Sequence, residues 1–145
     1  MQVIQILREK GREVVSLSSE ATLSEAARLL ARKRIGALVV KDGQGALAGI
    51  LSERDVVRAV AEGSVTALAR PVSAVMTRAV ATCTEFDTVE ELMEMMTQGR
   101  FRHVPVLDGN SQLCGLVSIG DVVKVHIEET MREAASLRQY IAAAG

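Results

Sequence analysis

The sequence predicts an α/β (α+β) protein in which one β-α-β-β-α unit occurs twice in tandem. Three observations predict this fold class: an ungapped match of the chain to itself that places Thr22 on Thr88, the same order of apolar stretches and helical patterns in each copy, and an Asp-Gly pair at the same place in both. A doubled unit also predicts pseudo-twofold symmetry, with two equivalent clefts.

The self-match runs without a gap from Thr22–Val57 onto Thr88–Val123. It holds 12 identities in 36 positions, and many of the remaining pairs exchange one apolar residue for another. The identical residues of the first copy are Thr22, Glu25, Arg34, Val40, Asp42, Gly43, Leu47, Gly49, Ser52, Asp55, Val56 and Val57. Chance does not maintain one offset over that length, so the repeat is the basis of the architecture.

Each copy carries the same signals in order. A short apolar strand precedes a Thr-x-x-Glu capping box, in which the Thr and Glu side chains satisfy orphan amides at a helix start. An apolar strand with an Asp-Gly turn signal comes next, then a further strand and a helix that begins at Ser52 or Ser118. The predicted strands are 14–17, 37–40 and 47–51, and 80–83, 104–107 and 113–117. A unit of about 50 residues is too small to bury its own core well, so we expect the copies to pack sheet to sheet.

These patterns divide the chain into five segments. We expect an N-terminal helix over 1–12, the first unit over 13–63, a linker over 64–74 that contains Pro71, the second unit over 75–127, and an extension of the C-terminal helix over 128–145.

The composition excludes several classes of protein. The formal net charge is −1, so there is no electrostatic reason to seek nucleic acid or an anionic membrane. No apolar run approaches the roughly 20 residues that span a bilayer, and the N-terminus does not resemble a signal peptide. Cys83 and Cys114 are isolated, which disfavours a disulfide framework or a zinc site. We therefore expect a cytoplasmic protein with no metal and with neither nucleic-acid nor membrane partners.

The repeated segment that carries chemistry is Gly49-Ile50-Leu51-Ser52-Glu53-Arg54-Asp55, which recurs as Gly115-Leu116-Val117-Ser118-Ile119-Gly120-Asp121. It lies at a predicted strand-to-helix junction. A helix N-terminus suits a phosphate, the Ser hydroxyl can donate to a phosphate oxygen, and the Asp can accept from two ribose hydroxyls. Ser-x-x-Asp is equally a plain helix cap. One residue can have both roles, so both interpretations stay open.

These segments resemble the CBS-domain pair, also called the Bateman module, and in particular its small free-standing bacterial members. The phrase Phe101-Arg102-His103-Val104-Pro105-Val106-Leu107-Asp108 ahead of the second motif is typical of that family, as is Ile35-Gly36-Ala37-Leu38-Val39-Val40 ahead of the first. Members bind AMP, ADP, ATP, NAD(H), S-adenosylmethionine or nothing detectable. The resemblance therefore implies the fold strongly and an adenine nucleotide, AMP or possibly NAD(H), only as a class of ligand.

The resemblance also implies roles for particular residues. Asp55 and Asp121 would hold a ribose, and Ser52 and Ser118 would approach a phosphate. The backbone of the first strand would read the adenine edge, and the start of the second strand would line the same cleft. The corresponding residues are Val15, Ser16 and Leu17 with Gly36 and Ala37, and Ala81, Thr82 and Cys83 with Arg102, His103 and Pro105.

The two clefts are predicted to be unequal. The first copy has Arg54 in its motif where the second has Gly120, and the second has Arg102 and His103 where the first has Gly36 and Ala37. We therefore expect one cationic candidate in each cleft, from different places. Arg54 can also be a solvated helix residue and His103 a packed or surface histidine, and a dinucleotide could span the sites.

The predicted function is regulatory. No Gly-rich phosphate loop, metal-ligand spacing or nucleophile–base pair supports an enzyme. We expect a nucleotide-sensing module that forms a homodimer and signals to a separate, unknown protein effector by a change in conformation or association. The alternative is a structural or interaction protein that keeps the fold and binds no nucleotide.

Overall fold

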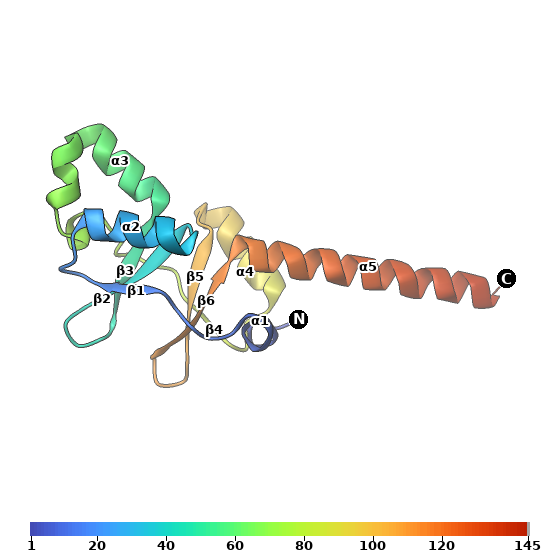
Figure 1. Cartoon of the computed structure of the whole chain (residues 1–145). Helices are drawn as coiled ribbons and strands as arrows, with labels where there is room; N and C mark the ends of the chain where they lie inside the picture. The colour runs from blue at the N-terminus through green and yellow to red at the C-terminus, as the bar shows by residue number, and fades with distance from the viewer. Residues whose placement is uncertain (145) are drawn as a thin grey trace.

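The computed structural model describes residues 1–144; Gly145, the last residue of the predicted 128–145 extension, lies outside the described residues. It confirms two tandem β-α-β-β-α units, with an N-terminal and a long C-terminal helix (Figure 1). The first unit comprises β1 (Ser16–Ser18), α2 (Leu23–Lys33), β2 (Ala37–Lys41), β3 (Leu47–Ser52) and α3 (Glu53–Gly63). The second comprises β4 (Cys83–Thr84), α4 (Val89–Gly99), β5 (His103–Leu107), β6 (Leu113–Ser118) and α5 (Ile119–Ala144). Outside the self-match lie α1 (Val3–Lys10) and two short 3₁₀ helices, η1 (Val65–Ala69) and η2 (Val72–Ala74).

The two sheets have the same topology and register. Each has three strands, with the first parallel to the second and the second antiparallel to the third. Val40 pairs with Gly49 in one sheet as Val106 pairs with Gly115 in the other, and both sheets have a bulge directly after that pair. The repeat seen in the sequence is therefore a repeat of backbone geometry.

The first strand of each unit is shorter than predicted. The predicted strand 14–17 is observed as Ser16–Ser18, and 80–83 is observed as Cys83–Thr84. Only these residues reach the parallel pairing with the middle strand. The residues just before Cys83 stay outside the ladder, and Val80 and Ala81 line a cleft instead.

Helix caps follow the predicted spacing. Thr88 accepts from the Glu91 amide at 3.1 Å while its own amide donates to the Glu91 carboxylate, which completes a capping box. Thr22 accepts from the Glu25 amide at 3.2 Å, but the Thr22 amide does not donate in return to the Glu25 carboxylate. The capping box is therefore complete in the second copy and half-formed in the first.

The Asp-Gly pairs do not form two-residue hairpin turns. The Asp42 carboxylate accepts from the amides of Gln44 and Ala46 at 2.8 and 3.0 Å, and Asp108 does the same in the second copy. The left-handed residue of the first loop is Gly45, at φ 81°, rather than Gly43. A side-chain turn therefore organises each loop, because Asp bonds the backbone two residues on.

Most of the buried hydrophobic residues form two clusters, one in each unit. One buried cluster joins α2 to the β2–β3 sheet, and the other joins α4 and the start of α5 to the β5–β6 sheet. Each cluster is completed by a segment from outside the self-match. The second core takes Val3, Ile6 and Leu7 of α1, whereas the first takes Val72, in the linker, and Met76, which follows the linker. Each unit therefore has a hydrophobic cluster of its own.

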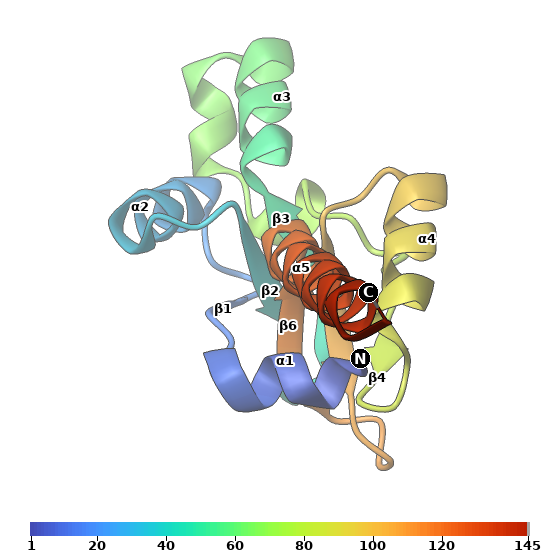
Figure 2. The same cartoon turned by 90° about the vertical axis from the view of Figure 1, so that its right-hand side faces the viewer.

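These two completing segments correspond to each other, with Met1 at the position of Arg70 and Val3 at that of Val72. The amides of Val72 and Val3 donate to the carbonyls of Ala21 and Asp87, at 2.8 and 2.9 Å. The carbonyls of Arg70 and Met1 accept from Leu23 and Val89 in the same way. Figure 2 shows α1 beside the second unit, so each unit is completed by the segment that precedes the other.

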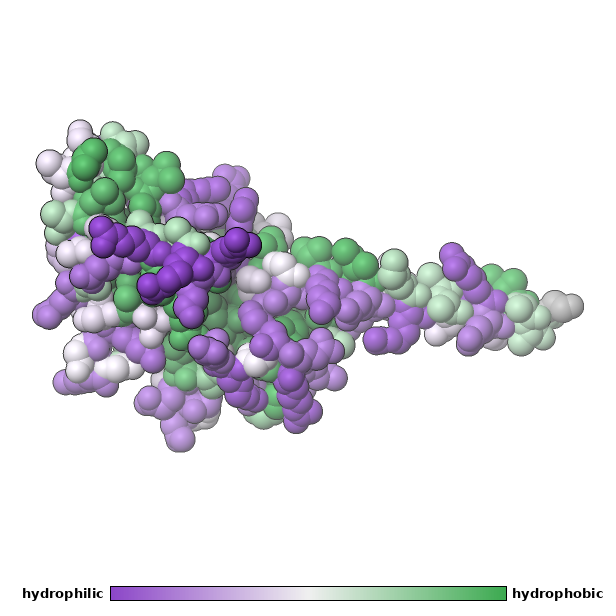
Figure 3. Space-filling model, viewed as in Figure 1, coloured by the Kyte–Doolittle hydropathy of each residue, from purple (hydrophilic) through white to green (hydrophobic). Residues whose placement is uncertain are grey.

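The C-terminal helix projects from the body as a free arm (Figure 1). Val122 and Val125 pack into the second core, whereas every residue from Thr130 to Ala144 is exposed. Figure 3 shows apolar surface along this arm and over α3. Among residues 1–144, no helix is long and apolar enough to cross a membrane.

Candidate functional site

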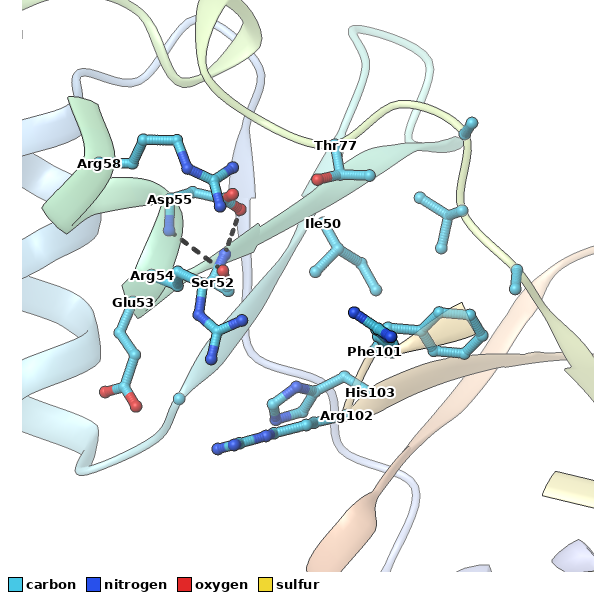
Figure 4. A pocket seen from close by; sticks show the side chains of 15 residues that line it. Ile50, Ser52, Glu53, Arg54, Asp55, Arg58, Thr77, Phe101, Arg102 and His103 are labelled. Carbon is cyan, nitrogen blue, oxygen red and sulfur yellow. Dashed lines mark hydrogen bonds between the residues drawn. The ribbon is translucent and has the colours of Figure 1, made fainter. Parts of the chain in front are cut away.

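Seven of the predicted ligand-binding residues line a cleft of about 360 Å³ between the two units. We call it the first cleft. One wall is the first motif at the β3–α3 junction, the second is the extended stretch before β4, and the third is the chain between α4 and β5. Its lining residues are Gly36, Ile50, Ser52, Glu53, Arg54, Asp55, Arg58, Thr77, Ala79, Val80, Ala81, Arg100, Phe101, Arg102 and His103 (Figure 4).

Ser52 and Asp55 form a helix cap at the edge of this cleft. The Ser52 amide donates to the Asp55 carboxylate at 2.9 Å, and the Asp55 amide donates to Ser52 Oγ at 3.2 Å (Figure 4). The Glu53 amide donates to the carbonyl of Gly36 at 2.9 Å. Two of the first three amides of α3 are thus already bonded within the protein. The plain capping interpretation holds, and the remaining carboxylate lone pairs of Asp55 stay available to a ligand.

Four arginines surround the first cleft: Arg54 and Arg58 from α3, and Arg100 and Arg102 from the turn before β5. Among residues 1–144, the carboxylates within 4 Å of a basic group pair with Met1, Lys10 and Arg12, so none of the four forms an ion pair. Figure 4 shows the labelled side chains of Arg54, Arg58 and Arg102 around the opening. The four arginines outnumber the two carboxylates of the lining, Glu53 and Asp55, so the cleft has an excess of positive charge that suits an anion.

This grouping overturns the prediction of one cationic candidate in each cleft. Arg54 of the first copy and Arg102 and His103 of the second line the same cleft. The reason is the pseudo-twofold arrangement, in which the starts of β2 and β5 lie against each other. A Cβ placed on Gly36 would lie 3.7 Å from His103 Cε1.

His103 lies between the two motifs and is mostly buried. Burial lowers the pKa of His103 below its ordinary value, and the positive charges of Lys10 and Arg102 act in the same direction. The carboxylates of Asp121 and Glu53 oppose this shift. The imidazole is consequently biased towards its neutral form, and an added negative charge would favour the protonated form.

The second motif forms the same cap but has a different neighbour. Asp121 Oδ2 accepts from the amide and the hydroxyl of Ser118, at 2.9 and 3.0 Å, and from Lys10 Nζ at 2.7 Å. Burial alone would raise the pKa of Asp121, but the hydrogen bonds from Lys10 and Ser118 outweigh it and hold that pKa below its ordinary value. Ser118 and Asp121 are therefore brought together, away from the first cleft.

The other predicted residues divide by burial. Ala37, Cys83 and Pro105 are buried in the sheets, and burial raises the pKa of the Cys83 thiol to about 12. Such residues can serve a ligand only through their backbone. Ser16 and Leu17 lie in β1, Val15 directly precedes it and Thr82 directly precedes β4, and none of these four lines the first cleft.

Sequence reasoning missed several lining residues, chiefly Arg58, Arg100, Phe101 and Thr77. Arg100 carried a signal, since it is identical to Arg34 in the self-match, and both residues end a helix with φ near 55°. Arg58 lies one turn beyond Arg54 on α3, so helical spacing could have found it. Thr77 carried no signal in the sequence, because backbone pairing with Ile50 places it at the cleft.

Comparisons with known proteins agree with this geometry. The family model described as "CBS domain" matches residues 3–62 and 72–128. An uncharacterized 17.7 kDa protein of Acidianus ambivalens is 33% identical over 116 residues, which cover 80% of this chain and 69% of that one. The crystal structure of a CBS-domain containing protein from Agrobacterium tumefaciens superposes with a TM-score of 0.83 at 46% identity, over 86% of this chain and 92% of that one.

Two further solved structures contain ligands. A CBS domain protein from Pyrobaculum aerophilum, complexed with AMP, has a TM-score of 0.75 at 32% identity, over 83% of this chain and 89% of that one. A CBS domain pair in complex with 5-methylthioadenosine and S-adenosyl-L-methionine has a TM-score of 0.78 at 26% identity, over 89% of this chain and 98% of that one. The ligands of both structures contain adenosine.

Proposed function

Because the chain belongs to the CBS domain family, we propose that it is a regulatory module that binds an adenine nucleotide in the first cleft. The observation that carries this proposal is the placement of Asp55 beside four arginines that form no ion pair. A nucleotide presents ribose hydroxyls that a carboxylate can accept from, and phosphate oxygens that guanidinium groups bind through paired hydrogen bonds. The adenosine-containing ligands of the structural relatives support the same class of ligand.

In the proposed complex, Asp55 accepts from the ribose hydroxyls. The phosphate lies near Ser52 and among Arg54, Arg58, Arg100 and Arg102. Because most of the first amides of α3 are already bonded, the arginines supply the main attraction and the helix dipole a smaller one. The adenine lies against the apolar wall formed by Ile50, Val80 and Phe101.

We place the chain among binding modules and not among enzymes. The polar side chains of the first cleft are four guanidinium groups, one imidazole, the hydroxyls of Ser52 and Thr77, and the carboxylates of Glu53 and Asp55, and this arginine-rich set suits the binding of a nucleotide. The Ser52 hydroxyl accepts from the Asp55 amide, an arrangement of a helix cap and not of a nucleophile activated by a base.

The output of the module passes to a second copy and to a separate protein effector. Support for self-association comes from α5, where large apolar side chains stay exposed along one stripe: Ile119, Val123, Ile127, Leu137 and Ile141. A nucleotide in the first cleft contacts both units. It therefore favours one arrangement of the two units relative to each other and to the α5 arm. The alternative proposal, a module that keeps the fold and binds nothing, leaves the clustered arginines without a role.

Isothermal titration calorimetry tests the proposal. AMP, ADP, ATP and NADH are titrated into the wild-type chain and into Asp55→Ala and Asp121→Ala. We expect Asp55→Ala to lose at least tenfold in affinity, while Asp121→Ala keeps the first binding event. Both substitutions remove a helix cap, so unfolding midpoints serve as the control for folding. A wild-type chain that binds none of these ligands would support the non-binding alternative.

A further inference from the structure

Lys10 joins the last turn of α1 to the second motif. Its ammonium donates to Asp121 Oδ2 at 2.7 Å and to the carbonyl oxygen of Leu116 at 3.0 Å. Asp121 is partly shielded, with 22% of its side chain exposed, and Lys10 retains 36%. The lysine therefore bonds directly to the carboxylate that corresponds to Asp55 in the first cleft.

The pseudo-twofold symmetry shows what Lys10 replaces. Leu116 corresponds to Ile50, and the Ile50 carbonyl accepts from the backbone amide of Thr77 at 2.9 Å. In the second unit the helix α1 continues to Lys10, and the lysine ammonium bonds the equivalent carbonyl. A side chain therefore makes, in the second unit, a bond that the backbone makes in the first.

The first cleft has no such group. In the correspondence that places Val3 on Val72, Lys10 falls on Ala79, which lines the first cleft. Asp55 accepts one bond there, from the Ser52 amide at 2.9 Å. Asp121 Oδ2 accepts three, from Lys10 and from two groups of Ser118. Asp55 Oδ2 therefore keeps room for a ribose hydroxyl, whereas Asp121 Oδ2 is fully bonded and leaves only Oδ1 of its carboxylate.

We propose that Lys10 is an internal competitor for the second motif and thereby decides which of the two sites binds nucleotide. Its ammonium occupies Oδ2 of the carboxylate that a ribose would need, so the first cleft fills first. The second site takes ligand only when the Lys10–Asp121 pair opens. This inference rests on the proposed function, since it assigns Asp121 the ribose role given to Asp55.

The strength of the competition follows from exposure. A partly exposed ion pair contributes modestly, and the second bond, to Leu116, adds to it. We therefore expect Lys10 to weaken the second site by about three- to tenfold, which excess nucleotide can overcome. Lys10 therefore raises the nucleotide concentration that the second site needs, and it does not block that site permanently.

The test isolates the second site by removing the first. AMP is titrated by calorimetry into Asp55→Ala and into the double variant Asp55→Ala/Lys10→Ala. We expect the double variant to bind AMP three- to tenfold more tightly. The matched control is Asp55→Ala/Arg8→Ala, which removes an exposed cation from the same helix and should bind as Asp55→Ala does. Unfolding midpoints verify that the variants are folded.

Each outcome is decisive. Tighter binding on loss of Lys10 alone supports the inference. Unchanged binding overturns it, and weaker binding overturns it by showing that Lys10 holds the ligand itself. Failure of the wild-type chain to bind any nucleotide overturns both this inference and the proposed function. Binding to the wild-type chain without an effect of Lys10→Ala overturns this inference alone.

Discussion

The carbonyl oxygen of Thr77 lies so close to Gly49 that a Cβ built there would be 2.6 Å away. Gly115, at the same position of the second unit, faces the side chain of Leu7 instead, with Cδ2 at 2.6 Å from such a Cβ. Both glycines of the repeated motif therefore allow a neighbouring group to come close to the strand. At Gly49 this group is the Thr77 backbone, and at Gly115 it is the Leu7 side chain.

This difference predicts unequal effects of alanine. Gly49→Ala must displace the backbone at Thr77, which pairs with Ile50, whereas Gly115→Ala must displace one end of Leu7. We expect both to lower the free energy of unfolding, within the roughly 1–3 kcal/mol typical of overpacking, and Gly49→Ala to lower it more. Urea unfolding measures both values. A larger effect at Gly115 would contradict the placement of the Thr77 backbone against Gly49.

The arginines of the first cleft predict a salt-dependent preference for charged ligands. Arg54→Gln removes one guanidinium without changing the cap, so we expect AMP affinity to fall about tenfold, in line with one charged hydrogen bond. Adenosine, which lacks the phosphate, should bind more weakly than AMP to the wild-type chain. Its affinity should change little with Arg54→Gln or with added salt.

The control for this prediction is Arg32→Gln, on the exposed last turn of α2 and outside the cleft. It has the same change in charge and should leave AMP affinity unchanged. Equal losses from both substitutions would show that net charge alone attracts the nucleotide.

The lowered pKa of His103 predicts that the protein takes up protons when it binds a nucleotide. Its pKa is lowered in the free protein, chiefly by burial. A phosphate in the first cleft would raise that pKa, so binding favours the protonated imidazole. AMP affinity should therefore rise as the pH falls from 7.5 towards the lowered pKa of the free protein. Calorimetry at several pH values measures how AMP affinity depends on pH. The His103→Gln variant should show a weaker dependence of affinity on pH. An unchanged slope in that variant would place the linked proton elsewhere.

The same shift has a consequence for stability. Because the pKa of His103 is lower in the folded state than its ordinary value of 6.5, the unfolded chain binds the proton more readily. The contribution of His103 to the free energy of unfolding is thus fully present above about pH 6.5, and it is lost as the pH falls through the pKa of the folded state. The unfolding midpoint of His103→Gln should decline less between pH 7 and pH 5.5 than that of the wild-type chain.

The exposed stripe on α5 predicts self-association. Leu137 and Ile141 are 59 and 61% exposed, one helical turn apart. We expect the wild-type chain to have twice its 15.5 kDa mass in light scattering, and Leu137→Asp to shift it towards the monomer. Gln139→Asp adds the same charge on the opposite side of the helix and should stay dimeric. A wild-type mass that stays at that of one chain at every concentration would rule out this dimer.

Much of the fold could be predicted because the repeat preserves the residues that set backbone geometry. Thr22 and Thr88 mark helix starts, and Gly49 and Gly115 mark equivalent positions of the third strands. The correspondence of Met1–Leu7 with Arg70–Met76 was missed, since it depends on backbone hydrogen bonds to Ala21 and Asp87, which impose little on side chains.

The site was predicted in part. The pairing of Ser52 with Asp55 follows from local spacing, which sequence displays directly. The grouping of Arg54 with Arg102 depends on how the two units face each other across the pseudo-twofold axis, which no local pattern records. The contact of Lys10 with Asp121 spans 111 positions of the chain and arises only after α1 packs on the second unit.

A crystal structure of the wild-type chain grown with AMP tests binding in the first cleft most directly. We expect ribose hydroxyls within hydrogen-bond distance of Asp55 and the phosphate among Arg54, Arg58, Arg100 and Arg102. At limiting AMP, the Lys10–Asp121 pair should remain closed. AMP bound at Asp121 with the first cleft unfilled would contradict the proposed site.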